Sequence, residues 1–233
     1  MAKGNKIKWT LMAMLRLFLF FVAFTITPVI IYKFMPPPVT PLMFLRALDN
    51  KMEGDSLQLS YKWVSIDEMS PNLYQAAVAA EDDQFMTHNG FDLEAMQLAF
   101  ESNQKSETKI KGGSTISQQT SKNVFLWPHR DYLRKGMEAW FTVLIEQIWG
   151  KERIMETYLN VVELGDGVYG VEAASQKYFK KPASKLTKSE AAALIAVLPN
   201  PHIYKVLNPS VYTQRYKYAI VTRMGLMPKV KFR

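Results

Sequence analysis

A cluster of acidic residues is the first feature of this sequence with the chemistry of a reactive site. Glu81, Asp82 and Asp83 follow an apolar segment with helical spacing, at the end where the helix dipole is negative. Like charges at short range and a negative dipole end both raise the pKa of a carboxyl toward the range in which it transfers protons. Glu81 is therefore a candidate general base. The alternative is a solvated acidic turn in which His88 only packs, because perturbed carboxyls mark functional sites only statistically.

A glycine pair, Gly112-Gly113, leads into a segment with helical character. Free backbone N–H groups at a helix N-terminus attract anionic oxygens. A helix that begins at Ser114 puts Ser114, Gln118 and Lys122 at i, i+4 and i+8, on one face. Hydroxyl, amide and ammonium groups on one face suit sugar hydroxyls and phosphate. The segment lacks the P-loop spacing Gly-x-x-x-x-Gly-Lys, and a solvated polar face remains the alternative.

Two cations and an acid follow in a longer helical segment. Arg134 and Glu138 are four residues apart and Lys135 and Glu138 are three apart, so both cations reach the carboxylate. In isolation such a group is most often a surface ion pair with little effect on stability. The functional interpretation is a pair of fixed cations for a diphosphate, held by an acid that binds a metal ion or assists the leaving group.

A fourth segment, Lys151 to Asn160, has apolar residues at helical spacing. We interpret it as a packing helix in which Glu156 and Asn160 form structural hydrogen bonds. The glycine-rich run 163–170 follows it, and we expect this turn to bring the chain close to the cleft.

Capping signals place these groups on helices. Capping-box patterns begin at Ser65 and Thr187, Ser70 is followed by proline, and Gly150 is a good stop residue. Alternating strand patterns are almost absent, apart from a short one at 57–64, so the fold class is mostly α. The signals predict helices over 71–82, 92–100, 114–124, 131–149, 151–164, 171–179 and 191–198, and a last helix opened by Asn208-Pro209.

The N-terminal segment has the length and composition of a membrane anchor. Residues 17–32 carry no charge, and a membrane-crossing helix needs roughly 20 mostly apolar residues. Lys3, Lys6, Lys8 and Arg16 precede the apolar run, so the positive-inside rule puts the N-terminus in the cytoplasm and the rest outside. No small-residue cleavage site follows, which favours an anchor over a cleaved signal. We expect a tail at 1–10, an anchor at 11–33, a proline-rich linker and membrane-proximal segment at 34–55 and the main domain at 56–233.

Composition excludes several classes. The chain has 233 residues, 48% hydrophobic and 21% charged, which is not the composition of a disordered protein. It has no cysteine and only 3 histidines, so thiolate chemistry is excluded and a histidine metal cluster is disfavoured. The net charge of +8 indicates an anionic partner. With the main domain outside the cytoplasm, we expect no nucleic acid among its partners.

The four motifs, in order, resemble those of the peptidoglycan glycosyltransferases of glycosyltransferase family 51. They read Glu-Asp-x-x-Phe-x-x-His-x-Gly, then Gly-x-Ser-Thr-Ile-x-Gln-Gln-x-x-Lys-Asn, then Arg-Lys-x-x-Glu, then Lys-x-x-Ile-x-Glu-x-Tyr-Leu-Asn. The resemblance covers about 56–209 and implies a lysozyme-like, two-lobed helical domain. It also implies polymerisation of lipid II into β-1,4 glycan strands, with inversion and release of undecaprenyl diphosphate. The chain shows no Lys-Thr-Gly motif, so we expect no transpeptidase domain.

Carried over residue by residue, the resemblance makes Glu81 the general base and Glu138 the second acidic residue. It implies no organic cofactor, and Mg²⁺ or Mn²⁺ at Glu138 as the candidate metal. One departure is that many relatives carry a basic residue where this chain has Gln97-Leu98, and Arg130 is a candidate substitute for it. The substrate-binding residues that we expect are Phe85, Ser114, Gln118, Gln119, Lys122, Asn123, Arg130, Arg134 and Lys135.

The resemblance also implies a location and partners. The expected location is the inner membrane, crossed once, with the catalytic domain on the periplasmic face. The expected partners are lipid II, the growing lipid-linked strand, membrane lipid and proteins of cell-wall synthesis or division.

Two other functions remain as alternatives. A lysozyme-type lytic enzyme also uses a glutamate but needs no cations for a diphosphate. A membrane-anchored wall-binding protein needs neither the Glu81 nor the Glu138 carboxylate.

Overall fold

The computed structural model describes residues 2–52, 59–104, 112–129 and 131–232. The chain divides into two compact units, Met1–Pro36 and Pro37–Arg233. The first unit is the helix α1 (Ala2–Phe34), which contains Pro28. Its stretch Lys8–Phe34 has a mean hydropathy of 2.3 and is long and apolar enough to cross a membrane. This stretch contains the anchor expected at 11–33.

The second unit is built of helices, as the capping signals predict. Short 3₁₀ turns at Ile66–Glu68 and Ala183–Lys185 join them, and the only strands among the described residues are β1 (Ser60–Tyr61) and β2 (Val168–Tyr169). The fold class, mostly α with one N-terminal apolar helix, is confirmed. The helices are α2 (Pro41–Met52), α3 (Pro71–Glu81), α4 (Leu93–Gln104), α5 (Ile116–Phe125), α6 (Tyr132–Ile148), α7 (Lys151–Val161), α8 (Val171–Phe179), α9 (Lys188–Ile195) and α10 (Val211–Leu226).

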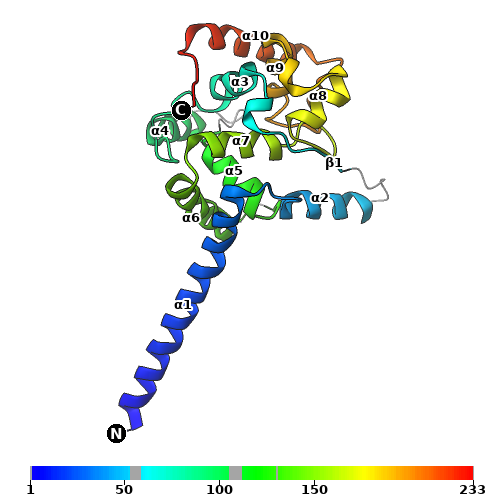
Figure 1. Cartoon of the computed structure of the whole chain (residues 1–233). Helices are drawn as coiled ribbons and strands as arrows, with labels where there is room; N and C mark the ends of the chain where they lie inside the picture. Colours follow the sequence, from blue (N-terminus) through cyan, green and yellow to red (C-terminus); the bar gives the residue numbers. More distant parts are fainter. Residues whose placement is uncertain (1, 53–58, 105–111, 130, 233) are drawn as a thin grey trace. The chain divides into compact units, whose positions relative to one another are not determined.

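Within this unit, α5 and α7 occupy the middle (Figure 1). The helices α3, α9 and α10 pack together at one end, while α6 and α2 pack on α5 at the other. The apolar side chains of the central helices are inaccessible to solvent: Ile116, Ile154, Met155 and Leu159 are all 0% exposed. Because α5 packs on α7 on one side and on α2 and α6 on the other, its residues lie between the two ends of the unit.

The fourth motif has the packing role that the sequence predicts. Asn160, at 0% exposure, accepts from Val64 N–H at 3.0 Å and donates to the Val64 carbonyl at 2.9 Å. Glu156 accepts from the backbone N–H of Ile66 at 3.2 Å. These bonds attach α7 to the segment that leads into α3, and thereby support the first motif.

Three local predictions differ from the structure. The N-cap of α5 is Thr115, so Ser114 lies just before the helix. The strand β2 is missing from the sequence prediction; it pairs in parallel with β1, with Ser60 opposite Val168. The expected linker 34–55 contains α2, which belongs to the second unit and packs on α5.

Candidate active site

Glu81 is the last residue of α3 and lines a cavity of about 420 Å³. Gly112, Gly113 and Ser114 line the same cavity, as does Arg223 of α10. The pKa of Glu81 is raised above its ordinary value of 4.5, chiefly by burial. A hydrogen bond from Gln119 and the charge of Lys122 oppose this rise, and the charge of Asp82 adds to it. The direction agrees with the prediction for a general base, but burial contributes more to it than the neighbouring acid does.

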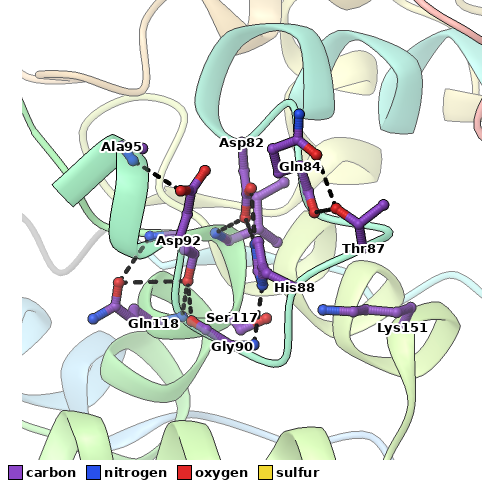
Figure 2. A network of polar contacts seen from close by, with 12 residues as sticks. Asp82, Gln84, Thr87, His88, Gly90, Asp92, Ala95, Ser117, Gln118 and Lys151 are labelled. Atoms are coloured by element: carbon purple, nitrogen blue, oxygen red, sulfur yellow. Dashed lines mark hydrogen bonds and ion pairs between the residues drawn. The ribbon is translucent and has the colours of Figure 1, made fainter. Parts of the chain in front are cut away.

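A buried network attaches the first motif to the N-terminus of α5 (Figure 2). Asp82 accepts from the backbone N–H of Ile116 at 2.9 Å and from His88 Nε2 at 2.9 Å. His88 Nδ1 accepts from the N–H of Gly90 at 3.0 Å, which leaves the ring proton on Nε2, facing Asp82. The Gly90 carbonyl accepts from the Thr115 hydroxyl at 2.6 Å. These bonds hold Glu81 and the start of α5 in a fixed relation.

Gly90 has a backbone conformation that only glycine adopts readily here. Its φ is +94°, and a Cβ would lie 2.8 Å from Thr142 Cγ2 and 3.0 Å from Glu146 Cγ. We expect Gly90→Ala to lower the free energy of unfolding by roughly 2–4 kcal/mol, from backbone strain and overpacking together. Chemical denaturation measures this change.

Gly136 is the matched control, because nothing lies within 4 Å of its Cβ position. It lies inside α6, where alanine is favoured over glycine by roughly 0.5–1 kcal/mol. Gly136→Ala is therefore expected to stabilise the protein. Equal effects of the two substitutions would contradict the packing argument.

The helix α5 brings the base and the cations together. Gln119 Nε2 donates to Glu81 Oε2 at 2.8 Å, and Lys122 is close enough to lower the pKa of that carboxyl. A second, smaller cavity of about 150 Å³ is lined by Gln119, Lys122 and Asn123 of α5 and by Arg134 of α6. Gln119 therefore contacts the acid and also lines the basic cavity.

The cations of the third motif lie beside this cavity. Arg134 Nη1 is 3.1 Å from Glu138 Oε2, and Lys135 Nζ is 2.5 Å from Glu138 Oε1. Lys135 also donates to Ser114 Oγ at 3.5 Å, which connects the third motif to the wall of the larger cavity. Glu138 is 3% exposed, so this is not the surface ion pair that the sequence left open. The buried Nε of Arg134 has no hydrogen-bond partner within the described residues.

The donor groups at Glu138 do not fit a preformed metal site. Both of its carboxylate oxygens are paired with cations, and no group of three or more His, Asp or Glu side chains suited to a metal is present among the described residues. A divalent ion prefers free oxygen ligands, so we derive no step through a metal at Glu138.

Three other expected contacts need separate comment. Phe85 is 0% exposed and packs in the core, with Lys151 Nζ 4.7 Å from its ring centroid. Gln118 is 2% exposed and completes the capping box of α5, since its Oε1 accepts from Thr115 N–H at 3.0 Å. The cap therefore uses the Gln118 amide, and Gln118 lines neither cavity, whereas Ser114 lines the larger one and Lys122 the smaller. Arg130 lies outside the described residues.

Four residues at the site were missed by the sequence analysis. Arg46 of α2 and Glu163 form an ion pair, and both line the smaller cavity. Arg223 lines the larger cavity, and Tyr158 of α7 contacts Gln119. Arg46 and Arg223 lie outside the four motifs, so no local spacing pointed to them. Tyr158 lies inside the fourth motif, where helical periodicity correctly indicated a core position.

The chain belongs to the transglycosylase family: residues 50–225 match the family model described as "Transglycosylase". It is a peptidoglycan glycosyltransferase whose domain has the lysozyme-like helical fold. Curated relatives agree. Proteins named "Biosynthetic peptidoglycan transglycosylase" are 54% identical in Caulobacter vibrioides, over 87% of this chain and 85% of the relative, and 48% identical in Bdellovibrio bacteriovorus, over 94% and 85%. The relative of that name in Shewanella oneidensis is 46% identical over 98% of this chain and 96% of its own length.

Proposed function

We propose that this protein polymerises lipid II into β-1,4 glycan strands with inversion at the reacting carbon. The observation that supports this most strongly is the arrangement around α5. The partly buried carboxylate of Glu81 is hydrogen bonded to Gln119, and Gln119 and Lys122 of the same helix line a cavity shared with Arg134. Base and cations at one site match a reaction that removes a hydroxyl proton and releases an anionic diphosphate.

In this mechanism the growing strand is the donor and its C1 carries the lipid diphosphate. The 4-hydroxyl oxygen of lipid II forms a bond to C1 while the bond from C1 to the diphosphate oxygen breaks. Glu81 takes the hydroxyl proton. The charge that develops on the leaving diphosphate is stabilised by Lys122, Arg134 and Lys135. Glu138, paired with both α6 cations, holds their side chains in position.

The remaining expected contacts divide into two groups in this proposal. Ser114 and Asn123 line the cavities and contact substrate directly. Phe85 and Gln118 act on the substrate only indirectly, because they are buried and stabilise the loop and the cap that hold Glu81 and α5. Arg46 lines the cationic cavity and is our candidate for the basic contact missing near Gln97.

The proposed location is the inner membrane, with the catalytic unit on the periplasmic face. The apolar stretch Lys8–Phe34 supports a single span, and the basic residues before it support a cytoplasmic N-terminus. Both substrates carry polyprenyl tails, so an anchored enzyme meets them within the plane of the bilayer.

Apolar side chains on α4 support direct contact of the catalytic unit with lipid. Leu93, Leu98 and Phe100 are 73%, 59% and 64% exposed, and Met96 is 37% exposed, so these side chains lie on the surface. The helix begins near the larger cavity, where Asp92 and Ala95 line the wall. A lipid tail bound at the site would leave it close to this apolar face.

We expect Leu98→Ser combined with Phe100→Ser to reduce polymerisation in vesicles about tenfold, because two apolar groups no longer enter lipid. The free energy of unfolding should change by less than about 0.5 kcal/mol, since both side chains are exposed. Vesicle assays and thermal unfolding measure the two effects. Val211→Ser with Tyr218→Ser, at exposed positions of α10, is the control. Unchanged vesicle activity would contradict the lipid contact.

The proposed function is tested by incubating the purified full chain with labelled lipid II in detergent. The expected product is a ladder of glycan strands on a gel, which lysozyme digestion removes. Release of soluble fragments from sacculi without polymer formation would instead indicate a lytic enzyme. Wall binding that survives loss of both Glu81 and Glu138, with no product in either assay, would indicate a binding protein.

A further inference from the structure

The Gln119 side chain has hydrogen-bond partners at both ends of its amide. Its Nε2 donates to Glu81 Oε2 at 2.8 Å, and its Oε1 accepts from the hydroxyl of Tyr158 at 3.3 Å. Tyr158 lies on α7 and is 0% exposed, so it cannot touch the substrate. We propose that Tyr158 is a positioning residue that orients the Gln119 amide and, through it, the reacting carboxylate of Glu81. This inference rests on the proposed role of Glu81 as the base.

The orientation of the amide matters because its two ends have opposite hydrogen-bonding character. In the observed arrangement, tyrosine hydroxyl, amide and carboxylate form a chain in which each donor faces an acceptor. Such chains strengthen their members by mutual polarisation. Rotating the amide by half a turn would direct its carbonyl oxygen at the carboxylate of Glu81, which is repulsive. The Tyr158 hydroxyl opposes that rotation, because it gives the carbonyl end a buried donor on the side away from Glu81.

The arrangement distinguishes the two oxygens of Glu81. Oε2 is held by Gln119, while no donor to Oε1 is found in the described part of the chain. Oε1 is therefore the oxygen available to take the proton of the acceptor hydroxyl. A Gln119 amide free to rotate would leave Oε2 without a steady donor, and the ionised form of Glu81 would lose stabilisation.

The groups that face Glu81 are the neighbouring Asp82 and residues of three other helices. Asp82 follows α3 and raises the pKa of Glu81, whereas Lys122 of α5 lowers it. Tyr158 of α7 and Tyr216 of α10 both have a pKa raised above 10.0, first by burial and then by the charge of Glu81. Tyr158 therefore stays neutral and keeps its donor proton throughout the working pH range.

The test is Tyr158→Phe in the full chain, which removes one hydroxyl and little volume. The acid limb of the pH profile of kcat/KM for lipid II polymerisation should move upward by about one pKa unit, because a Gln119 amide that is free to rotate donates less steadily to the charged form of Glu81. At neutral pH kcat should fall about tenfold, while KM stays within about twofold because Tyr158 does not touch substrate. A purely structural role predicts no shift of the acid limb.

Tyr169→Phe is the matched control, since Tyr169 is also buried, at 1% exposure, but lies on β2. It should leave the acid limb in place. Gln119→Ala should move the acid limb upward as well, and adding Tyr158→Phe to it should produce no further shift, because the two residues act through one connection. Circular dichroism checks that each variant is folded.

A folded Tyr158→Phe with an unmoved acid limb would overturn the inference, as would a full additional shift in the Gln119→Ala background. If Tyr158→Phe does not fold, an unmoved acid limb in Gln119→Ala alone overturns it. Failure of the proposed function looks different, because the unmodified chain would then form no glycan polymer, and failure of the base role alone would leave polymerisation in Glu81→Gln. An inactive Glu81→Gln with an unaffected Tyr158→Phe removes only the positioning role.

Discussion

Glu81→Gln is expected to reduce lipid II polymerisation by about 10²–10⁴-fold, the range that a positioned general base contributes. The amide keeps the size of the side chain and an oxygen that can accept from Gln119 Nε2, as Glu81 does now at 2.8 Å. It cannot take a proton. The loss should therefore appear in kcat rather than in KM.

The pH dependence of the unmodified enzyme follows from the same carboxyl. Burial raises the pKa of Glu81 above 4.5, so activity falls as the pH falls through that raised pKa and the base becomes protonated. The acid limb of the profile should lie above 4.5 and should be absent from the residual activity of the Glu81→Gln variant.

As the pH rises through the raised pKa of Glu81, the free energy of unfolding should fall while the activity rises. Because folding raises the pKa of Glu81, the folded state favours the protonated form, and stability is lost as the pH rises from the ordinary value of 4.5 through the raised pKa. At neutral pH the neutral amide should therefore leave the free energy of unfolding unchanged or increase it. Denaturant titrations at two pH values measure this.

Glu152→Gln is the control for charge removal, since Glu152 is exposed at the start of α7. It should retain full activity. Polymerisation by Glu81→Gln at the unmodified rate would refute the base assignment.

The second large effect is expected for Lys122→Met, which should lower kcat by about 10²–10³-fold. Lys122 lines the cavity formed with Arg134, and a fixed charge aimed at a developing anion contributes on this scale. Methionine keeps the unbranched stem, so the cavity wall is retained while the charge is lost.

A second readout distinguishes loss of charge from loss of shape. The charge of Lys122 lowers the pKa of Glu81, so Lys122→Met should also move the acid limb upward. Lys177→Met, on the exposed surface of α8, is the control and should change neither quantity. A Lys122→Met variant with normal kcat would exclude this residue from stabilising the leaving diphosphate.

Local signals in the sequence were sufficient to predict where most of the helices begin and end. Ser70 caps α3, Thr187 opens α9 through a capping box, and Asp131 caps α6 where expected. These features depend on side chains that bond to a backbone within three residues of themselves. The sequence also identified Glu81 and Arg134 as candidate site residues. The spacing of residues along a helix determines which side chains share a face.

Tertiary structure decided which of these residues meet. The capping box at Thr115 uses the amide of Gln118, and Gln119, which points about 100° further around the helix axis, contacts Glu81 of another helix. Arg46 and Tyr158 enter the site from helices distant in the sequence. Periodicity describes how a helix is buried but not which partner buries it, because packing between distant segments depends on the whole core.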